Sequence, residues 1–141
     1  MSTAEASVNH NLFPLTVLCH PRCSTCKKAL AWLDNHGIAY VWRSIIEENP
    51  TVDELNRWTH ATDLPIRRFF NTSGNVYREN KVKNTLDDWE KTLSPEQFHD
   101  HAVQLLSTDG MMCKRPIVLS HSGDFLTVGF KESVWEQIFL N

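Results

Sequence analysis

The sequence reads TVLCHPRCSTC from Thr16 to Cys26, and this stretch decides the fold. Its apolar start, Thr16–Cys19, predicts a short buried strand, and the helix-like run Lys27–Asn35 follows the cysteines. Cys23 and Cys26 therefore stand at the start of a helix, nearly one turn apart and on the same side. Unpaired N–H groups and the helix dipole favour a thiolate there. We expect Cys23 to be the reactive thiol and Cys26 to attack a mixed disulfide formed at Cys23.

The segments on either side of the first predicted helix extend this unit. Gly37 ends the helix, and Tyr40–Ile45 predicts a second strand, parallel to the first because the crossover is long and right-handed. Near the C-terminus, Ile117–Ser120 and Phe125–Val128 predict a hairpin, and a closing helix from about Glu132 to Leu140 follows it.

The middle of the chain, Glu47–Met112, is predicted to be helical, because helix caps recur there and β-rich runs disappear. Two capping boxes are expected, one at Thr51 with Glu54 and one at Ser94 with Gln97. Between them we expect a short helix at Leu64–Phe70 and a turn at Asn71–Gly74. Gly110 is expected to end the second capped helix.

The predicted order of elements is βαβ, a helical insertion and then ββα, which is the layout of a thioredoxin-like α/β fold. We expect a flexible tail at residues 1–14 and a single domain at 15–141, with the insertion at 46–112. A chain of 141 residues with 41% hydrophobic content suits one core. Arg115-Pro116 precedes the third strand, where thioredoxin-like folds hold a cis-proline that faces the active cysteine.

Composition excludes several classes of protein. With 14 basic and 17 acidic residues and a net charge of -3, the chain shows no sign of direct nucleic-acid binding. It holds no apolar run near the ~20 residues of a membrane helix, and no signal peptide, so we expect a cytoplasmic protein. In that reducing compartment, we expect the cysteine pair to cycle between dithiol and disulfide.

Three separated blocks of sequence carry a family resemblance. They are Pro21–Ala29, Phe69–Gly74 with Tyr77-Arg78, and Gly110–Met112 with Lys114–Ile117. From Leu15 to Asn141 the chain resembles the arsenate reductase (ArsC/Spx/MgsR) family, in the branch that carries a CxxC pair. The resemblance implies that Cys23 is the nucleophile.

In arsenate reductases, three arginines hold the oxyanion beside this cysteine. Arg115 matches one of them, whereas Asn71 and Gly129 stand at the other two positions. Losing two guanidinium groups removes most of the bidentate binding capacity, which weighs against arsenate reduction.

The leading hypothesis is therefore a thiol-disulfide oxidoreductase of glutaredoxin-like character, acting on glutathione mixed disulfides or on a protein disulfide. Cys23 attacks, Cys26 resolves, and Arg115 stabilises the thiolate and binds a carboxylate of the ligand. No metal or tightly bound cofactor is expected, and glutathione is a candidate co-substrate. The further substrate-binding candidates are Arg22, Asn71, Thr72, Ser73 and Pro116.

Two alternatives stay open. The resemblance also covers redox-sensing, Spx-like transcriptional regulators that bind the RNA polymerase α subunit, and the CxxC pair fits that role equally well. Arsenate reductase is the further alternative.

Several residues have simpler interpretations. Cys19 is expected to be a small core residue, while Cys113, close to Arg115, keeps an alternative resolving role open. A zinc site is disfavoured because no second ligand pair accompanies the CxxC. His99 and His101 are expected to be solvent-exposed, and Arg67-Arg68 is either exposed charge or part of an anion-binding rim.

Overall fold

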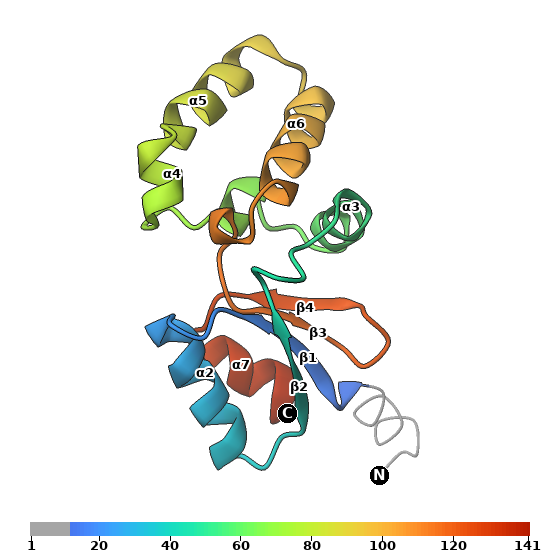
Figure 1. Ribbon diagram of the computed structural model, residues 1–141. Coiled ribbons are helices and arrows are strands. Elements are labelled where there is room, and N and C mark those ends of the chain that lie inside the picture. Colours follow the sequence, from blue (N-terminus) through green and yellow to red (C-terminus); the bar gives the residue numbers. More distant parts are fainter. Residues whose placement is uncertain (1–11) are drawn as a thin grey trace. The chain divides into compact units, whose positions relative to one another are not determined.

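A four-stranded mixed sheet organises one of the two units into which the chain divides (Figure 1). The computed structural model describes residues 12–141. Residues 12–44 with Arg115–Asn141 form the first unit, here called the sheet unit, and Ile45–Lys114 form the second, the helical unit. Most of the predicted tail, residues 1–11, lies outside the described residues. Leu12 and Phe13, also assigned to the tail, pack against the core of the sheet unit.

The sheet has the strand order β2-β1-β3-β4. β1 (Leu15–Cys19) pairs in parallel with β2 (Tyr40–Ser44) and antiparallel with β3 (Ile117–Leu119), and β3 pairs antiparallel with β4 (Phe125–Val128). The predicted α/β order and hairpin are confirmed. The two central strands, β1 and β3, are the two that lead directly to the cysteines and to Arg115.

Helices α2 (Ser24–Asn35) and α7 (Glu132–Phe139) lie side by side on one face of this sheet (Figure 1). Trp32 of α2 packs edge-on against Trp135 of α7, with ring centroids 5.7 Å apart. Aromatic rings in this arrangement bury a large apolar area, so the two helices and the sheet share one core. The predicted end of α2 is confirmed, because Gly37 adopts a positive φ of 65°.

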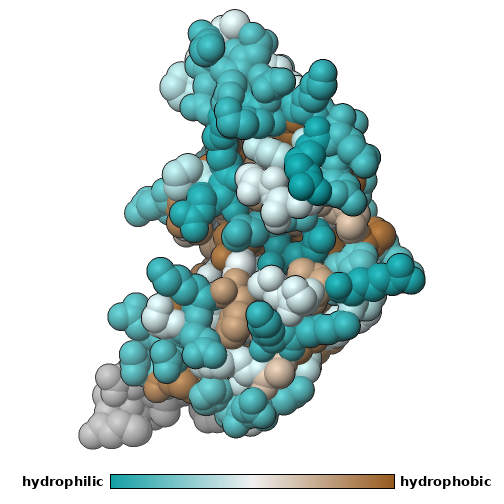
Figure 2. Space-filling model, turned by 90° about the vertical axis from the view of Figure 1, so that its left-hand side faces the viewer, coloured by the Kyte–Doolittle hydropathy of each residue, from teal (hydrophilic) through white to brown (hydrophobic). Residues whose placement is uncertain are grey.

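The helical unit contains α3 (Val52–His60), η1 (Ile66–Phe69), α4 (Asn75–Glu79), α5 (Val82–Thr92), α6 (Pro95–Ser107) and η2 (Gly110–Met112). Both predicted capping boxes are present, at the starts of α3 and α6. Hydrophilic side chains cover most of the surface of this unit in the face shown in Figure 2. Its apolar residues turn inward instead, as the buried Val82 and Leu86 of α5 do.

The expectation that Gly110 ends a helix is wrong. α6 ends at Ser107, and Gly110 opens the short 3-10 helix η2. A Cβ atom at Gly110 would lie 1.8 Å from the backbone oxygen of Ile45. Glycine is therefore required by the close approach of two backbone segments, and not by a helix cap.

Arg67 is paired within the helical unit. Its guanidinium forms ion pairs with Asp87, at 3.0 Å, and with Glu90. These contacts link η1 to α5. The Arg67 charge, a sequence candidate for an anion-binding rim, is therefore bound to carboxylates of the protein itself. Asp87 and Glu90 of α5 thus serve partly to bind Arg67.

Among residues 12–141, no helix is both long enough and apolar enough to span a membrane.

Candidate functional site

The two cysteines of the CxxC motif occupy different environments at the start of α2. Cys23 is the N-cap residue, with extended backbone angles, and its side chain is half-buried. Cys26 is the third residue of the helix and is only 1% exposed. The turn before them is closed by a hydrogen bond from the Cys23 N–H to the His20 carbonyl, at 3.1 Å. An outside molecule can thus reach Cys23 more easily than Cys26.

Hydrogen-bond donors converge on the sulfur of Cys26. The thiol of Cys19 is the main donor, the His20 N–H and the Cys23 thiol also donate, and the Arg115 charge adds to them. Together they lower the pKa of Cys26 to about 6, against the opposing effect of burial. A hydrogen bond to the charged form of a group favours that form, so Cys26 is held as a thiolate at neutral pH.

Cys19 is the third member of this cluster. It ends β1, is fully buried and belongs to the same core cluster as Cys26, as the sequence predicted for a core residue. The hydrogen bond to Cys26 and burial raise the pKa of Cys19. Cys19 therefore stays protonated and donates a hydrogen bond to the sulfur of Cys26.

Sequence reasoning did not foresee the contact between Cys19 and Cys26. The available signal was the position of Cys19 at the carboxyl end of the strand that feeds the cysteine helix. The end of such a strand and the first turn of the next helix commonly meet at ligand sites. The structure therefore assigns three sulfurs to the site, where the motif alone gives two.

Arg115 and Pro116 reach the same place from β3. The Arg115–Pro116 peptide bond is cis, as predicted. β1 pairs with β3 so that Leu18 faces Ile117, and one further step in this register places Cys19 opposite Pro116. The positive charge of Arg115 lowers the pKa of Cys26 and that of His20, so its guanidinium acts on the site electrostatically.

His20 is a neutral neighbour of the thiols. Burial lowers its pKa first, and the charges of Arg115 and Arg22 lower it further. Its Nδ1 accepts a hydrogen bond from the Arg22 N–H at 3.0 Å, a role that an imidazolium could not fill. His20 thus adds no positive charge, and Arg115 supplies the one that acts on Cys26.

The predicted substrate-binding residues are split between the two units. Arg22 and Pro116 lie in the sheet unit with the cysteines, and Arg22 is exposed. Asn71, Thr72 and Ser73 lie in the helical unit, where the Asn71 N–H donates to the Met112 carbonyl at 2.8 Å. Their part in binding a ligand stays a prediction.

Cys113 has the surroundings of a core residue. It is fully buried in the helical unit, and its sulfur donates to the Leu106 carbonyl at 3.6 Å. A carbonyl oxygen only accepts, so the Cys113 thiol is the donor in this contact. Nothing in these contacts favours the resolving role that the sequence left open.

The expectation that His99 is solvent-exposed is wrong. It is half-buried, lies 2.9 Å from the hydroxyl of Thr59 and stacks against His60, with ring centroids 4.4 Å apart. His101 is exposed as expected, and its Nδ1 contacts the Gln97 carbonyl. The two histidines point to different faces of α6, and the face of His99 is the one packed on α3.

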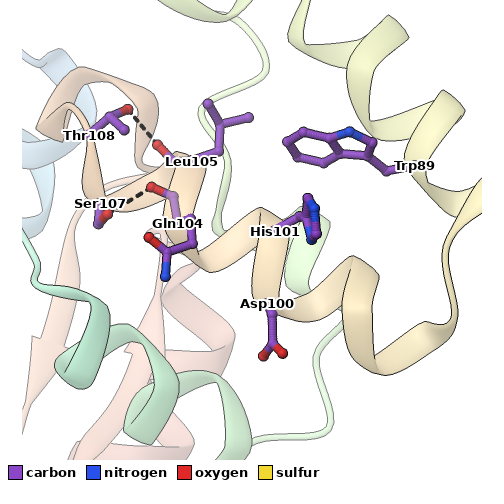
Figure 3. A pocket seen from close by; sticks show the side chains of 7 residues that line it. All are labelled: Trp89, Asp100, His101, Gln104, Leu105, Ser107 and Thr108. Atoms are coloured by element: carbon purple, nitrogen blue, oxygen red, sulfur yellow. Dashed lines mark hydrogen bonds between the residues drawn. The ribbon is translucent and has the colours of Figure 1, made fainter.

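A pocket of about 430 Å³ lies along α6 and α5 of the helical unit (Figure 3). Trp89 and His101 pack edge-on against each other in its lining, with ring centroids 5.2 Å apart. The hydroxyls of Ser107 and Thr108 donate to backbone carbonyls of their own helix. The lining therefore combines an aromatic wall with two hydroxyls that are bound to backbone carbonyls. Within residues 12–141, no group of three histidine, cysteine, aspartate or glutamate side chains could hold a metal ion.

Comparisons with known proteins agree with these features. Residues 18–138 match the sequence model of the ArsC family. A crystal structure of an ArsC-family-related protein from Bacteroides fragilis superposes with a TM-score of 0.75 at 40% identity, covering 88% of this chain and 97% of that one. A possible arsenate reductase from Streptococcus mutans superposes with a TM-score of 0.70 at 34% identity, covering 83% and 91%. The predicted thioredoxin-like fold and the family resemblance are confirmed.

Relatives known from sequence carry different names. The uncharacterized protein YusI of Bacillus subtilis is 38% identical over 123 residues, which cover 87% of this chain and 96% of YusI. The global transcriptional regulator Spx 2 of Bacillus cereus is 29% identical over 110 residues, covering 78% and 75%. A possible arsenate reductase and a transcriptional regulator thus both stand among the proteins that this chain is similar to.

Proposed function

The chain belongs to the ArsC family, and from this premise we propose that it is a cytoplasmic thiol-disulfide oxidoreductase that reduces glutathione mixed disulfides or protein disulfides. The observation that carries the proposal is the cluster of sulfurs around Cys26. A buried thiolate in contact with a half-buried thiol at a helix start is the arrangement that disulfide exchange needs.

The reaction begins at Cys23, the more accessible sulfur. Its proton passes along the hydrogen bond to Cys26, and the Cys23 thiolate attacks a substrate disulfide. The substrate S–S bond breaks, one half leaves as a thiol, and the other half stays bound to Cys23 as a mixed disulfide.

Cys26 then completes the cycle. After it gives up the proton to the departing thiol, its thiolate attacks the sulfur of Cys23, releases the second half of the substrate and leaves a Cys23–Cys26 disulfide. The two cysteines have lost two electrons, which the substrate has gained. Two molecules of glutathione, or a dithiol protein, return the pair to its reduced form.

Arg115 supplies the positive charge of this site. Its guanidinium stabilises the thiolate, as its effect on the pKa of Cys26 supports, and offers a fork for a carboxylate of glutathione or of a peptide. Glutathione carries two carboxylates, so it is a suitable ligand. Arg22 and Pro116, in the same unit as Arg115, are further candidates for contacts with this ligand, and Asn71, Thr72 and Ser73 of the helical unit stay candidates from the sequence alone.

Arsenate reductase is a weaker candidate, supported by similarity to the possible arsenate reductase of Streptococcus mutans. Gly129, at one of the family's arginine positions, has a positive φ of 80°. Its N–H donates to the Pro116 carbonyl at 2.8 Å, and its carbonyl accepts from Trp135 Nε1 at 3.1 Å. Arginine would strain this backbone, so the oxyanion site is not easily completed there.

The test is a turnover assay run in parallel with arsenate, a glutathione mixed disulfide and a thioredoxin-linked disulfide. We expect turnover with one of the two disulfides, and a loss of at least about a thousandfold in Cys23→Ser, because the nucleophile is gone. Cys26→Ser should lose a protein-disulfide reaction as well, since no internal thiol resolves it.

Cys113→Ser is the matched control, because it removes a buried cysteine outside the thiol cluster. It should keep full turnover. Turnover with arsenate alone, or equal activity in Cys23→Ser and the wild type, would refute the proposed function.

The second candidate is a redox-sensing regulator that binds the RNA polymerase α subunit. It is favoured by the similarity to proteins named global transcriptional regulators, such as Spx 2 of Bacillus cereus. In that case oxidation of Cys23 and Cys26 would alter a protein-binding surface instead of serving turnover. A pull-down with the C-terminal domain of the α subunit separates the two, since binding without disulfide turnover would favour the regulator.

A further inference from the structure

The sheet unit holds a third thiol that the proposed cycle does not use. Cys19 is fully buried at the end of β1, in the same core cluster as Cys26, and Cys23 packs against that cluster from its edge. Cys26 is in hydrogen-bond contact with both other sulfurs. A disulfide at Cys26 can therefore have either of two partners.

We propose that Cys19 is a second resolving thiol, which converts the Cys23–Cys26 disulfide into a Cys19–Cys26 disulfide and returns Cys23 to its reduced form. The inference rests on the proposed function, because that function supplies the Cys23–Cys26 disulfide. It adds a redox role to a residue that otherwise packs in the core and donates a hydrogen bond to Cys26.

The exchange balances without an outside reagent. The Cys19 thiolate attacks Cys26, the Cys19–Cys26 bond forms and the Cys23–Cys26 bond breaks. Cys23 leaves as a thiolate and takes up the proton that Cys19 released. One disulfide and one thiol stand on each side of the reaction, so no electrons enter or leave.

The protonation of Cys19 changes in the direction that this step needs. In the reduced protein, its pKa is raised by the hydrogen bond to Cys26, by burial and by the negative charges of Cys26 and Cys23. A disulfide between Cys23 and Cys26 has no charge and offers no thiolate acceptor, so three of these causes disappear. The Arg115 charge, which lowers the pKa of Cys19, remains. Oxidation of the outer pair thus makes the inner thiol easier to deprotonate.

The exchange also moves the disulfide inward. Cys19 and Cys26 are 0% and 1% exposed, whereas Cys23 is half-buried. A Cys19–Cys26 disulfide would be shielded from outside thiols, and the freed Cys23 would stand at the accessible edge, able to attack a second disulfide.

The order of residues makes the two disulfides easy to distinguish. Arg22 directly precedes Cys23, and the chain contains no lysine or arginine before it. Trypsin therefore places Cys19 in peptide 1–22, and both Cys23 and Cys26 in peptide 23–27. A Cys23–Cys26 disulfide stays within one peptide, while a Cys19–Cys26 disulfide links two.

The experiment oxidises the full chain with oxidised glutathione in glutathione redox buffers, quenches with acid, alkylates the remaining thiols and maps the tryptic peptides by mass spectrometry. We expect the linked peptides 1–22 and 23–27, with the alkyl label on Cys23. Their amount should be within about tenfold of the internal disulfide, since both bonds draw on the same sulfur. Cys19→Ser should remove the linked form and Cys113→Ser should keep it.

If the linked form amounts to less than about one hundredth of the Cys23–Cys26 disulfide at equilibrium, this inference is wrong and the proposed function stands. A linked form labelled on Cys26 would also overturn it, because Cys19 would then be bonded to Cys23. If neither disulfide forms and the turnover assay is also negative, both proposals fail together.

Discussion

The two units surround their buried cysteines with hydrogen bonds of opposite direction. In the helical unit, the thiol of Cys113 donates to the Leu106 carbonyl, and Arg67 lies between two carboxylates. In the sheet unit, Cys26 is just as buried as Cys113, yet its neighbours donate to it. Burial alone therefore does not decide whether a cysteine is inert. The direction of its hydrogen bonds does.

The largest effect that we expect comes from the backbone of the helical unit. In Gly110→Ala, the new Cβ would meet the Ile45 backbone oxygen at 1.8 Å, and a backbone neighbour has little freedom to move. The free energy of unfolding should fall by at least about 3 kcal/mol in denaturant titrations.

Gly37→Ala in the sheet unit is the comparison. Gly37 has a positive φ but nothing within 4 Å of its Cβ position, so the cost should be about 1 kcal/mol. Equal losses in the two variants would mean that the close approach at Gly110 relaxes freely.

The second prediction compares the arginines of the two units. Arg115→Ala should lower disulfide turnover on the order of tenfold, because the charge that stabilises the thiolate is lost. Arg67→Ala should leave turnover nearly unchanged and lower only the melting temperature, since Arg67 is bound to Asp87 and Glu90. Loss of turnover in Arg67→Ala with an active Arg115→Ala protein would show that the site is assigned to the wrong unit.

The third prediction tests the direction of hydrogen bonding within the thiol cluster. Cys19→Ala removes the main donor to Cys26, so the pKa of Cys26 should rise from about 6 toward that of an ordinary thiol. Cys19→Ser keeps a donor and should shift the pKa less. The ultraviolet absorbance of the thiolate across pH reports the change, with Cys26→Ser as the baseline and Cys113→Ala as the control. An identical titration in Cys19→Ala and the wild type would contradict the assigned contact.

The smallest expected effect lies at His99 in the helical unit. Burial lowers its pKa, the neighbouring His60 lowers it further, and Asp100 opposes them. Below the ordinary histidine pKa of about 6.5 the unfolded chain binds a proton that folded His99 does not, so stability declines as pH falls through that window. Urea unfolding at about pH 7 and pH 5 should show a smaller decline in His99→Gln than in the wild type.

His101→Gln is the control for His99, because His101 is exposed on the other face of α6. Its unfolding is measured at the same two pH values, so that the change at His99 can be compared with that at an exposed histidine of the same helix. A matching decline in the wild type and His99→Gln would show that His99 titrates equally in the folded and unfolded chains.

Local signals in the sequence predicted most of the fold. Capping boxes at Thr51 and Ser94, the glycine after α2 and the hairpin between β3 and β4 each depend on a few neighbouring residues, and each is confirmed. The prediction that Gly110 ends a helix was wrong because the role of this glycine depends on Ile45, which is 65 residues away in the chain. A glycine near a helix end looks the same in sequence whether it caps the helix or admits another backbone.

The candidate site likewise combines features that local sequence predicts with contacts that it does not. The positions of Cys23 and Cys26 follow from the motif, and the cis bond at Pro116 follows from the family layout. The contact of Cys19 with Cys26 and the pairing of His99 with Thr59 depend on packing between separate elements. Spacing along the sequence does not reveal such contacts. Cys19 was therefore interpreted only as a core residue, and His99 as solvent-exposed.

The order of strands in the sheet has a consequence for how the protein can be observed. β1 and β3 are the central strands, and the cysteine segment leaves the first of them while Arg115 and Pro116 enter the second. Amides in central strands exchange with solvent mainly when the whole unit opens. Hydrogen exchange at Val17 and Val118 should thus slow when the cluster is oxidised, if a disulfide ties the end of β1 to α2, so that isotope labelling of two valines would report on the chemistry of the sulfurs.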